Sequence, residues 1–530
     1  MASKELNTVE KKIINQIKQG NNFLLSGGAG SGKTYTLLEI VDKLFQDRNC
    51  KIGCITYTNN AADEIEERFK GNENNLVSKT YHDFLWGLIK NYNKNIKNSL
   101  ISLIEKEEVS YNGDFQKEWL EGRKINYREW KNFEKGIISH NEVIKIANKL
   151  FKNYPLLRKI LGNKFDFIFI DEYQDTQPEV IEIFLDYLES DNPPLIGLFG
   201  DSMQSIYNDG VGNIRDYVKK DKVVEIPKKD NFRSPKNIIS SLNKIRNDDL
   251  VQEQAGERDH SIDTVRFFYG YDEDIDINKV KKEDVFSEFD FSDPEENKEL
   301  YLTKRLIAKE CGFPDLLEAY KSKYRRYGSE KLIGDDPDAL ANHLYKIQNV
   351  VSLYKNEQYN EFIKKTDFKI IKGIDKQKLK ESINKLGKLT EKTIGEAINL
   401  ADDKKIVLVE VDNFNENLFN KIKDISYRQA IKAANYRNEH SPYSTQHNVK
   451  GAEFENVFIV LDNGGWNNYN FEELFNKDNG KETVLKRTRK LFYVCCSRAK
   501  KRLIIYYNKP DKEVLKTAKD WFGKNNIIKI

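Results

Sequence analysis

The segment GGAGSGKT at Gly27–Thr34 constrains the fold of this chain more than any other feature of its sequence. The apolar run Asn22–Ser26 precedes it and predicts a buried strand, and Tyr35–Phe45 carries apolar residues at helical spacing. Strand, glycine-rich loop and helix in this order are the context of a phosphate-binding P-loop. The glycines let successive backbone amides point at phosphate oxygens, and the positive end of the following helix helps to hold them.

A P-loop predicts a nucleoside triphosphate and Mg²⁺ as ligands, and we expect ATP here. The Lys33 ammonium can reach the terminal phosphates, and the Thr34 hydroxyl can ligate Mg²⁺. The residues expected to bind the nucleotide phosphates are Gly27, Gly28, Ala29, Gly30, Ser31, Gly32, Lys33 and Thr34.

Alternating strand and helix patterns predict a parallel α/β sheet around this loop. A helix is predicted at Ala61–Lys70, and three more apolar runs predict strands at Lys51–Thr58, Asp166–Ile170 and Pro194–Gly200. Asp171 and Glu172 follow one of these runs, at the strand end where such sheets bind ligands. There Asp171 can ligate or anchor Mg²⁺, and Glu172 can orient and deprotonate an attacking water.

The C-terminal half repeats the strand patterns, which predicts a second α/β unit starting near Val223 and continuing at Leu300–Ile307. Its later strands are expected at Lys405–Val411, Val457–Leu461 and Leu503–Tyr507, and the acidic stretch Asp272–Asn297 is expected to be a loop. Two charged, mostly helical blocks interrupt the units, the first between the second and third strands. The expected boundaries are 1–83 with 166–222 and 223–312 with 404–530 for the two α/β units, and 84–165 and 313–403 for the insertions.

Composition narrows the function classes only slightly. The 530 residues carry a formal net charge of +3, so positive charge for nucleic-acid binding has to be concentrated locally. The sequence has no apolar run long enough to cross a bilayer and no export signal at its start, and we expect no membrane partner. Its five cysteines include no Cys-x-x-Cys pair, which disfavours a disulfide framework or a zinc ribbon and fits a reducing cytoplasm.

Eight segments in a fixed order resemble the UvrD/Rep/PcrA-type superfamily 1 DNA helicases. They are GGAGSGKT at Gly27–Thr34, ITYTNNAADEIEERF at Ile55–Phe69, KTYHDF at Lys79–Phe84, FIDEYQDT at Phe169–Thr176, LFGDSMQSIY at Leu198–Tyr207, NFRSP at Asn231–Pro235, STQHNVKGAEFENV at Ser444–Val457 and RKLFYVCCSRAKKRL at Arg489–Leu503. The resemblance covers both α/β units and is weak or absent in the insertions. It implies two RecA-like P-loop motor domains with parallel sheets, each carrying a mostly helical insertion.

The resemblance also implies roles at the nucleotide. Gln204 resembles the glutamine that senses the terminal phosphate, and Arg233 and Arg498 resemble two arginines that reach across from the second motor domain. Such arginines stabilise the charge that grows on the transferring phosphoryl group. Glu453 matches the residue that holds the ribose, and Phe232 matches an aromatic residue that stacks on adenine.

A second implied set of residues faces single-stranded DNA, or DNA with a single-stranded tail. Aromatic side chains accept any base face, so they give a grip that is independent of sequence. The resemblance further implies movement from 3′ to 5′, driven by ATP-dependent closing and opening of the two motor domains. The residues matched to the strand are Tyr57, Thr58, Asn59, Thr80, His82, Tyr207, Thr445 and His447.

The sequence departs from the family at three places. Glu10 stands where the family has a glutamine that reads adenine, and a carboxylate cannot donate to the ring nitrogen, so ATP is less firmly preferred over GTP. Asn208, Asp209 and Gly210 follow Tyr207 where the family commonly has a base-stacking tryptophan, which predicts an altered grip. The second insertion lacks the duplex-binding segment of full-length relatives, which argues against processive unwinding by the chain alone.

Two functions remain open at this stage. The first is a DNA translocase or helicase, in DNA repair or antiphage defence. The second is a regulatory ATPase subunit that senses DNA or nucleotide and activates a partner nuclease, because HDFLW at His82–Trp86 and ITYTNNAADEI also resemble helicases of the Gabija antiphage system. A P-loop kinase would need neither Gln204 nor Arg498. Stacking residues tolerate either sugar, so RNA is an alternative strand.

Overall fold

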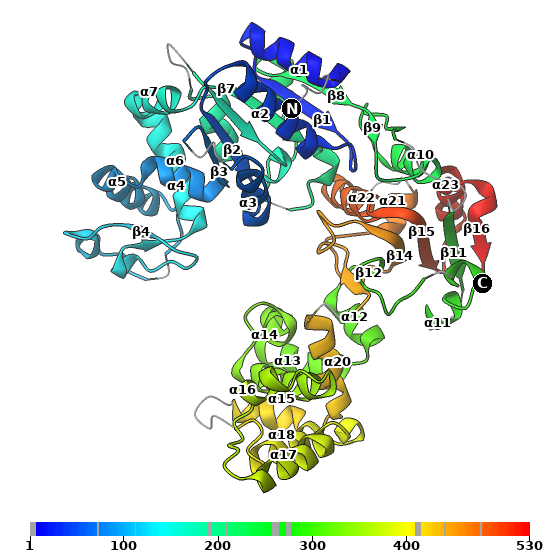
Figure 1. Cartoon of the computed structure of the whole chain (residues 1–530). Helices are drawn as coiled ribbons and strands as arrows, with labels where there is room; N and C mark the ends of the chain where they lie inside the picture. The colour runs from blue at the N-terminus through cyan, green and yellow to red at the C-terminus, as the bar shows by residue number, and fades with distance from the viewer. Residues whose placement is uncertain are drawn as a thin grey trace. The chain divides into compact units, whose positions relative to one another are not determined.

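The chain folds into two compact units, Met1–His260 and Ser261–Ile530, called unit 1 and unit 2 below. The structure is a computed structural model (Figure 1). Each unit contains one six-stranded parallel sheet, which confirms the predicted α/β class. The structure describes residues 7–70, 74–111, 113–188, 193–207, 209–256, 264–271, 277–287, 289–408, 415–438, 441–476 and 480–530.

The sheet of unit 1 has the strand order β3-β2-β6-β7-β1-β8. Its central strand β1 pairs with β7 and β8, so that Phe23 lies between Gly197 and Val224. All the predicted strands of this half are present. The strands are β1 Phe23–Gly27, β2 Ile52–Thr56, β3 Leu76–Thr80, β6 Phe167–Ile170, β7 Leu195–Gly200 and β8 Val224–Lys228.

Side chains that alternate along the strands fill two separate cores, one on each face of this sheet. In β6, Ile168 and Ile170 join one core, whereas Phe167 and Phe169 join the other. A strand buried on both faces has to be apolar throughout, which is why this one reads FIFI. The helices of unit 1 are α1 Thr8–Gln19, α2 Lys33–Asp47, α3 Asn59–Arg68, α4 Tyr81–Ile89, α5 Asn93–Glu105, α6 His140–Asn153, α7 Pro155–Lys164, α8 Pro178–Leu185, α9 Arg215–Lys219 and α10 Lys236–Ile245.

The first insertion is mostly helical, as predicted, but it follows β3 rather than the second strand. The strand β3 reads LVSKT, with a polar residue at its exposed position, and so shows no continuous apolar run. Four two-residue strands complete unit 1: β4 Asn126–Tyr127 pairs with β5 Ile137–Ile138, and β9 Asp230–Asn231 with β10 Glu253–Gln254.

The sheet of unit 2 has the order β13-β12-β14-β15-β11-β16. Its longest strands, β14 and β15, pair in parallel from Phe454 with Ala499 to Leu461 with Tyr507. The predicted strands near Val457 and Leu503 lie within them. The strands are β11 Thr264–Gly270, β12 Asn297–Tyr301, β13 Tyr443–Thr445, β14 Phe454–Leu461, β15 Ala499–Asn508 and β16 Ile527–Lys529.

One large core joins the sheet of unit 2 to its helical insertion: Phe458 and Ile504 of the sheet belong to the same cluster as Leu344 and Tyr427 of the helices. The insertion runs from α13 to α20, beyond the predicted end at residue 403. The helices of unit 2 are α11 Ile277–Val280, α12 Lys304–Cys311, α13 Pro314–Tyr324, α14 Gly328–Ile333, α15 Ala339–Lys355, α16 Tyr359–Lys365, α17 Gly373–Leu386, α18 Ile394–Asp403, α19 Glu416–Ile422, α20 Tyr427–Arg437, α21 Phe471–Asn476, α22 Glu482–Cys496 and α23 Lys512–Phe522.

The strand predicted at Lys405–Val411 is wrong over residues 405–408, and residues 409–411 lie outside the described part. Ile406 and Val407 are buried in the helical core of the insertion. The Ile406 carbonyl accepts from the Thr366 hydroxyl at 2.9 Å and from the Asp367 amide at 2.9 Å. The apolar run is therefore explained by packing against helices rather than by pairing in a sheet.

Two other expectations need correction. The boundary expected after residue 222 lies near residue 260, because β8 is an edge strand of the first sheet and pairs with β1. The loop expected over Asp272–Asn297 contains the short helix α11, and its Ile277, Val280 and Phe286 are buried. Residues 272–276 of that stretch lie outside the described part.

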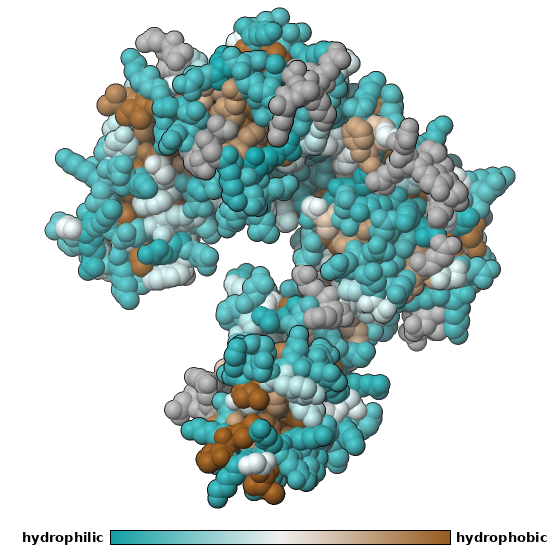
Figure 2. Space-filling model, in the orientation of Figure 1, coloured by the Kyte–Doolittle hydropathy of each residue, from teal (hydrophilic) through white to brown (hydrophobic). Residues whose placement is uncertain are grey.

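The surface is mostly hydrophilic, and apolar residues gather in a patch over the insertion of unit 2 (Figure 2). Exposed isoleucines in the segment that contains α16 and α17 are Ile363, Ile371 and Ile374. Within the described ranges, every helix is too short or too polar to cross a membrane.

Candidate functional site

The P-loop has the geometry that its sequence predicts. It leaves β1 at Gly27, turns through Gly30 and Gly32 with φ of 76° and 72°, and enters α2 at Lys33. These positive φ angles are the reason for glycine at both positions. The buried Lys33 ammonium donates to the Gly28 carbonyl at 3.3 Å, so it lies over the loop where terminal phosphates would bind.

A second segment of unit 1 packs directly on the loop. The amide nitrogens of Asn231 and Gln252 donate to the Ala29 carbonyl at 3.1 and 3.0 Å. A Cβ at Gly28 would lie 2.2 Å from the Gln252 side chain, and one at Gly30 would lie 2.6 Å from the Arg233 Cβ. Close packing therefore favours glycine at position 30, and a side chain at position 28 would displace the Gln252 amide from the loop.

The buried Ser31 side chain tests whether the loop fits a phosphate. In the part of the chain that the structure describes, its hydroxyl has no hydrogen-bond partner. A buried polar group without a partner costs free energy, and a phosphate oxygen would supply an acceptor. Together with the start of α2 and the Lys33 ammonium, this donor fits a triphosphate.

Thr34 and Asp171 lie together at the carboxyl end of the inner strand β6. The Thr34 hydroxyl donates to the Asp171 carboxylate at 2.8 Å, although the two residues are 137 positions apart. Burial raises the pKa of Asp171 to about 6, helped by the neighbouring Glu172, while Thr34 and Lys33 oppose the rise. A hydroxyl and a carboxylate so placed are the oxygen ligands that Mg²⁺ prefers.

Glu172 follows Asp171 in a strained conformation. Its φ of 49° places a non-glycine residue in the left-handed region, a feature that concentrates at functional sites. Its carboxylate accepts a hydrogen bond from the Gln174 amide. The carbonyl oxygen of the same Gln174 amide accepts from the Asp201 backbone at 3.0 Å, so Gln174 links Glu172 to the end of β7.

A buried ion pair completes this network. The Asp201 carboxylate accepts from Gln204 at 3.1 Å and from two nitrogens of Arg246 at 3.1 and 3.2 Å. Arg246 also pairs with Asp248 at 2.6 Å. Burial favours the neutral form of Asp201, but Arg246 and Lys33 outweigh it and hold the pKa of that carboxyl below its usual value. The sensing glutamine predicted at Gln204 is thus hydrogen-bonded to a carboxylate that stays charged.

Arg233 and Phe232 lie in unit 1, which corrects the expectation that Arg233 comes from the second motor domain. The Phe232 backbone amide donates to the Gly30 carbonyl at 2.8 Å, which ties this segment to the P-loop. Its ring is largely exposed, with the Lys228 ammonium 5.8 Å from the ring centre. An exposed ring beside the loop is accessible for stacking on a base, which stays a prediction.

Glu10 has a local structural role. Its two carboxylate oxygens accept from the backbone and side-chain nitrogens of Asn7, each at 2.8 Å, in a capping box at the start of α1. A capping box satisfies backbone donors at a helix start. This explains a glutamate at the position where relatives are expected to carry glutamine.

The strand-facing residues predicted in unit 1 form a row of rings. Tyr57 stacks on Tyr207 with centroids 5.5 Å apart and planes 12° apart, and the centroid of the Tyr81 ring lies 6.2 Å from that of Tyr57. The His82 ring is 3.9 Å from Tyr81 and 4.5 Å from His140 of the insertion. Both Tyr57 and Tyr207 are exposed, so this row offers flat surfaces to bases.

Two polar residues of that set, Thr58 and Thr80, are helix caps. The Thr58 hydroxyl accepts from the Ala61 amide at 3.3 Å, and Thr80 accepts from the Asp83 amide at 3.4 Å. Asn59 begins α3 and is exposed. Thr80 is buried, so its side chain is used inside the fold.

The residues predicted in unit 2 are bonded within that unit. Arg498 is 1% exposed and donates to the carbonyls of Val494 and Ala452 at 2.9 and 3.1 Å and to the Ser497 hydroxyl at 2.8 Å. Exposed Glu453 pairs with Lys500 at 3.2 Å. The guanidinium is therefore held at the end of α22 by fixed acceptors.

Thr445 is the last residue of the edge strand β13, and His447 follows it by two residues. Thr445 is buried, while His447 shares a hydrogen bond of 2.6 Å with the Tyr469 hydroxyl. Burial lowers the pKa of His447 to about 4, and burial together with His140 lowers that of His82 to about 3. Both imidazoles are therefore neutral near pH 7, so they can stack or share hydrogen bonds without adding charge.

Sequence reasoning missed several residues of the site. Gln174 and Asp201 lie within two of the segments that resemble the helicase family, FIDEYQDT and LFGDSMQSIY. Those motifs could have pointed to both residues. Arg246 and Gln252 lie in no such segment, and their contacts with Asp201 and Ala29 join residues 45 and 223 positions apart.

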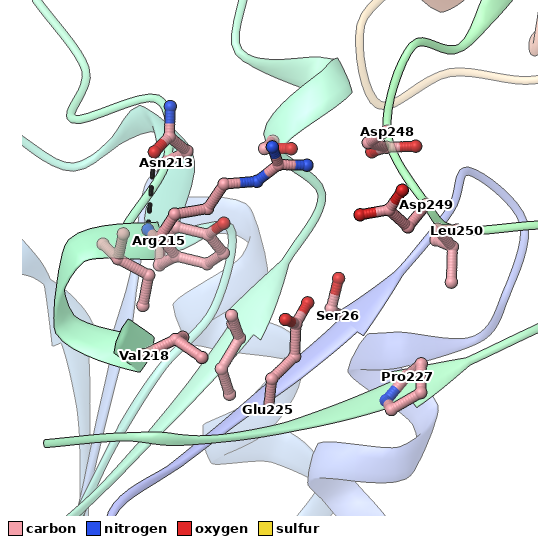
Figure 3. A pocket seen from close by; sticks show the side chains of 13 residues that line it. Ser26, Asn213, Arg215, Val218, Glu225, Pro227, Asp248, Asp249 and Leu250 are labelled. Atoms are coloured by element: carbon pink, nitrogen blue, oxygen red, sulfur yellow. Dashed lines mark hydrogen bonds between the residues drawn. The ribbon is translucent and has the colours of Figure 1, made fainter. Parts of the chain in front are cut away.

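A separate hollow lies in unit 1 between β1, β8 and α9. It has a volume of about 280 Å³ and contains no P-loop residue of 28–34 in its wall. Figure 3 shows the Arg215 guanidinium and the carboxylates of Glu225 and Asp249 around it, with Ser26 on its floor. It is thus distinct from the phosphate-binding loop.

Comparisons with known proteins match both units. The AAA domain family matches residues 10–209, and the UvrD-like helicase C-terminal domain family matches residues 272–510. Gabija protein GajB of Bacillus cereus strain HuB5-5 is 27% identical, over 97% of this chain and 96% of that protein. The protein of the same name from strain VD045 is 23% identical, over 97% and 98%. ATP-dependent DNA helicase Rep of Buchnera aphidicola subsp. Baizongia pistaciae is 27% identical, over 46% and 43%.

Proposed function

We propose, because this chain belongs to the UvrD/Rep/PcrA-type superfamily 1 helicases, that it hydrolyses ATP to move along single-stranded DNA from 3′ to 5′. The proposal rests mainly on one observation: four functional side chains lie together at one end of β1 and β6. They are those of Lys33, Thr34, Asp171 and Glu172. These four side chains supply a phosphate ligand, two metal ligands and a base.

The P-loop amides and Lys33 hold the ATP phosphates, and Thr34 and Asp171 hold Mg²⁺. When bound, the metal ion neutralises the phosphate charge that grows in the transition state. The exposed Phe232 ring is available to stack on the base, and the family resemblance assigns the ribose to Glu453. Arg233 and Arg498 supply positive charge to the phosphoryl group.

Glu172 accepts the proton of the attacking water. Its carboxylate is oriented by Gln174, which also contacts Asp201. Asp201 in turn bonds Gln204, so the base and the sensing glutamine share one buried network. Three hydrogen bonds therefore connect Glu172 to Gln204, so a change at the terminal phosphate can affect both side chains.

The strand runs over the Tyr57–Tyr207 rings of unit 1 and past His447 of unit 2. Stacking on aromatic rings gives about 1–3 kcal/mol for each base without reading its identity. This fits a motor that has to grip every sequence it passes. The caps at Thr58 and Thr80 hold the first turns of α3 and α4 beneath this track.

A second candidate is a regulatory ATPase subunit that activates a partner nuclease in antiphage defence. The alignment of two Gabija proteins over nearly the whole chain favours it. In that case ATP hydrolysis would respond to DNA, but strand displacement would need the partner.

The test is ATP hydrolysis by the purified chain with and without single-stranded DNA, and with RNA of the same sequence. We expect stimulation by DNA in the wild type and loss of hydrolysis in Lys33→Ala. The control is Lys43→Ala on the same helix, which removes a partly exposed ion pair with Asp47 at 2.8 Å. No stimulation by any nucleic acid would refute the translocase.

A second assay tests the direction of movement along the strand and whether the chain moves without a partner protein. We expect the chain to displace streptavidin from a biotin at the 5′ end of a single strand faster than from the 3′ end. Displacement at the 3′ end alone would reverse the direction, and no displacement despite stimulated hydrolysis would favour the regulatory subunit.

A further inference from the structure

The loop that follows β14 in unit 2, residues 462–470, walls a cavity of about 420 Å³. We propose that this cavity binds an unstacked base of the single strand. The inference rests on the proposed function and adds to it a base-binding site outside the matched motifs. Its lining includes Asn463, Trp466, Tyr469, Asn470, Glu473 and Lys481. The volume lies in the range of about 300–1,000 Å³ that is usual for small-molecule sites.

Two aromatic rings give the cavity its stacking surface. Trp466 and Tyr469 have centroids 5.0 Å apart at 62°, and His447 lies 5.8 Å from Trp466. Trp466 is nevertheless 40% exposed, so part of its ring is accessible for stacking. Since His447 is one of the residues matched to the strand, the cavity adjoins the predicted strand path of this unit.

The loop is held in shape without a ligand. Gly464 and Gly465 have φ of 59° and 72°, and the Gly464 amide donates to the Asp462 carboxylate at 2.7 Å. A Cβ at Gly464 would lie 2.9 Å from the Thr303 hydroxyl, so this turn rests against the end of β12. A preformed loop loses little conformational freedom when it binds.

Two asparagines of the cavity, Asn463 and Asn470, accept backbone hydrogen bonds with their side-chain oxygens. The Asn463 carbonyl oxygen accepts from the Phe471 amide at 3.1 Å, and the Asn470 carbonyl oxygen accepts from the Glu473 amide at 3.1 Å. Their remaining polar ends are NH₂ groups, which can donate to base carbonyls and ring nitrogens. The Glu473 carboxylate can accept from an exocyclic amino group. The set can therefore serve any of the bases.

Positive charge lies beside the rings. Lys481 lines the cavity, and the Arg487 guanidinium lies 6.0 Å from the Tyr469 ring and donates to the Asn468 carbonyl at 3.3 Å. A cation next to a stacking surface is the arrangement that holds a base and the phosphate attached to it.

The experiment compares wild type with Trp466→Ala and Trp466→Phe, using fluorescence anisotropy. The probes are labelled oligo-dT of about 20 nucleotides, longer than one binding site, and an abasic strand of equal length. Trp466→Ala should weaken oligo-dT binding about 5- to 100-fold and leave abasic binding unchanged, while Phe restores most of the affinity. The control is Tyr359→Ala, an exposed ring of the helical insertion, which should bind both strands as wild type does.

Each outcome decides the proposal, provided that the melting temperatures of the variants match the wild type. Equal binding of oligo-dT by wild type and Trp466→Ala would overturn it, and so would an equal loss for both strands. A wild type that binds neither strand would contradict the proposed function itself, which separates the two failures.

Discussion

The predicted functional side chains of unit 1 contact one another, whereas those of unit 2 are bonded to their own unit. In unit 1, one chain of contacts joins Thr34 and Asp171 of the metal site, and another joins Glu172 to Gln204 through Gln174 and Asp201. In unit 2, Arg498 donates to backbone carbonyls at the end of α22. Under the proposed function, the difference predicts two separable tasks: nucleotide binding by unit 1, and acceleration of hydrolysis by the Arg498 guanidinium of unit 2.

The strongest test of this division is Arg498→Ala. Loss of an arginine that stabilises the transferring phosphoryl group should lower kcat about 10³- to 10⁵-fold and leave ATP binding intact. Single-turnover hydrolysis and binding of a fluorescent ATP analogue measure the two effects. The matched control is Arg502→Ala, which removes another buried arginine of unit 2 that bonds Asn456 at 3.1 Å. Equal loss in both variants would mean that Arg498 is needed only for folding.

Within unit 1, Glu172→Gln should keep nucleotide binding and lower hydrolysis about 10²- to 10⁴-fold, because a neutral amide cannot accept the proton of the water. Glu179→Gln, on the first turn of α8, is the control and should hydrolyse as wild type does. Steady-state phosphate release measures both. A rate for Glu172→Gln near that of wild type would assign the base to another residue.

The buried ion pair between Asp201 and Arg246 should contribute to the free energy of unfolding. Arg246→Met leaves the buried Asp201 carboxylate without its cation and should lower the free energy of unfolding by about 3–5 kcal/mol. Lys222→Met removes a half-exposed pair with Asp186 and should cost at most about 1 kcal/mol. Urea unfolding compares them. A loss for Arg246→Met no larger than for Lys222→Met would show that the buried pair does not hold unit 1 together.

The strand-facing rings should have a smaller effect. Tyr57→Ala removes one ring of the stacked pair and should weaken binding to oligo-dT by about 1–3 kcal/mol. Tyr92→Ala, which removes an exposed tyrosine outside the row, should bind as wild type does. Anisotropy titrations decide between them, and equal affinities would remove Tyr57 from the strand path.

The smallest expected effect is on pH dependence. His82 and His447 have folded pKa values of about 3 and 4 against 6.5 unfolded, so the unfolded chain binds more protons between these values. Stability therefore rises with pH across this window and falls as pH drops below about 6.5, by about half a kcal/mol for each histidine between pH 7 and pH 6. Urea midpoints of His82→Gln and His447→Gln should depend less on pH than the wild type, and parallel curves would contradict this.

The sequence predicted the parts of the fold that local patterns determine. The P-loop needs glycines at fixed positions, and a strand buried on both faces reads as a continuous apolar run, as in FIFI of β6. The edge strand β3 was missed because the last three of its five residues, LVSKT, are polar. The strand β8 was assigned to the wrong unit because its pairing with β1 joins residues about 200 positions apart. The strand expected near Ile406 failed because a helical core buries the same residue types.

The residues of the candidate site also fall into two groups: those that a local sequence motif identifies and those that only the folded structure identifies. Lys33, Thr34, Asp171 and Glu172 lie at the ends of buried strands, where a motif and its setting agree. The roles of Glu10, Thr58 and Thr80 as helix caps depend on where helices begin, and capping and ligand binding use the same polar residues. Arg246 and Trp466 were not found, since their importance comes from contacts made only after folding.

The central claim is that ATP hydrolysis in unit 1 is coupled to movement along a single strand. The most direct measurement is the steady-state ATPase rate of the purified chain on saturating single-stranded DNA of increasing length. We expect the rate to rise with length and then level off, because a moving motor hydrolyses more ATP on each encounter with a longer strand. A DNA-stimulated rate that is the same for every length above one binding site would contradict movement, and would leave the chain a DNA-sensing ATPase.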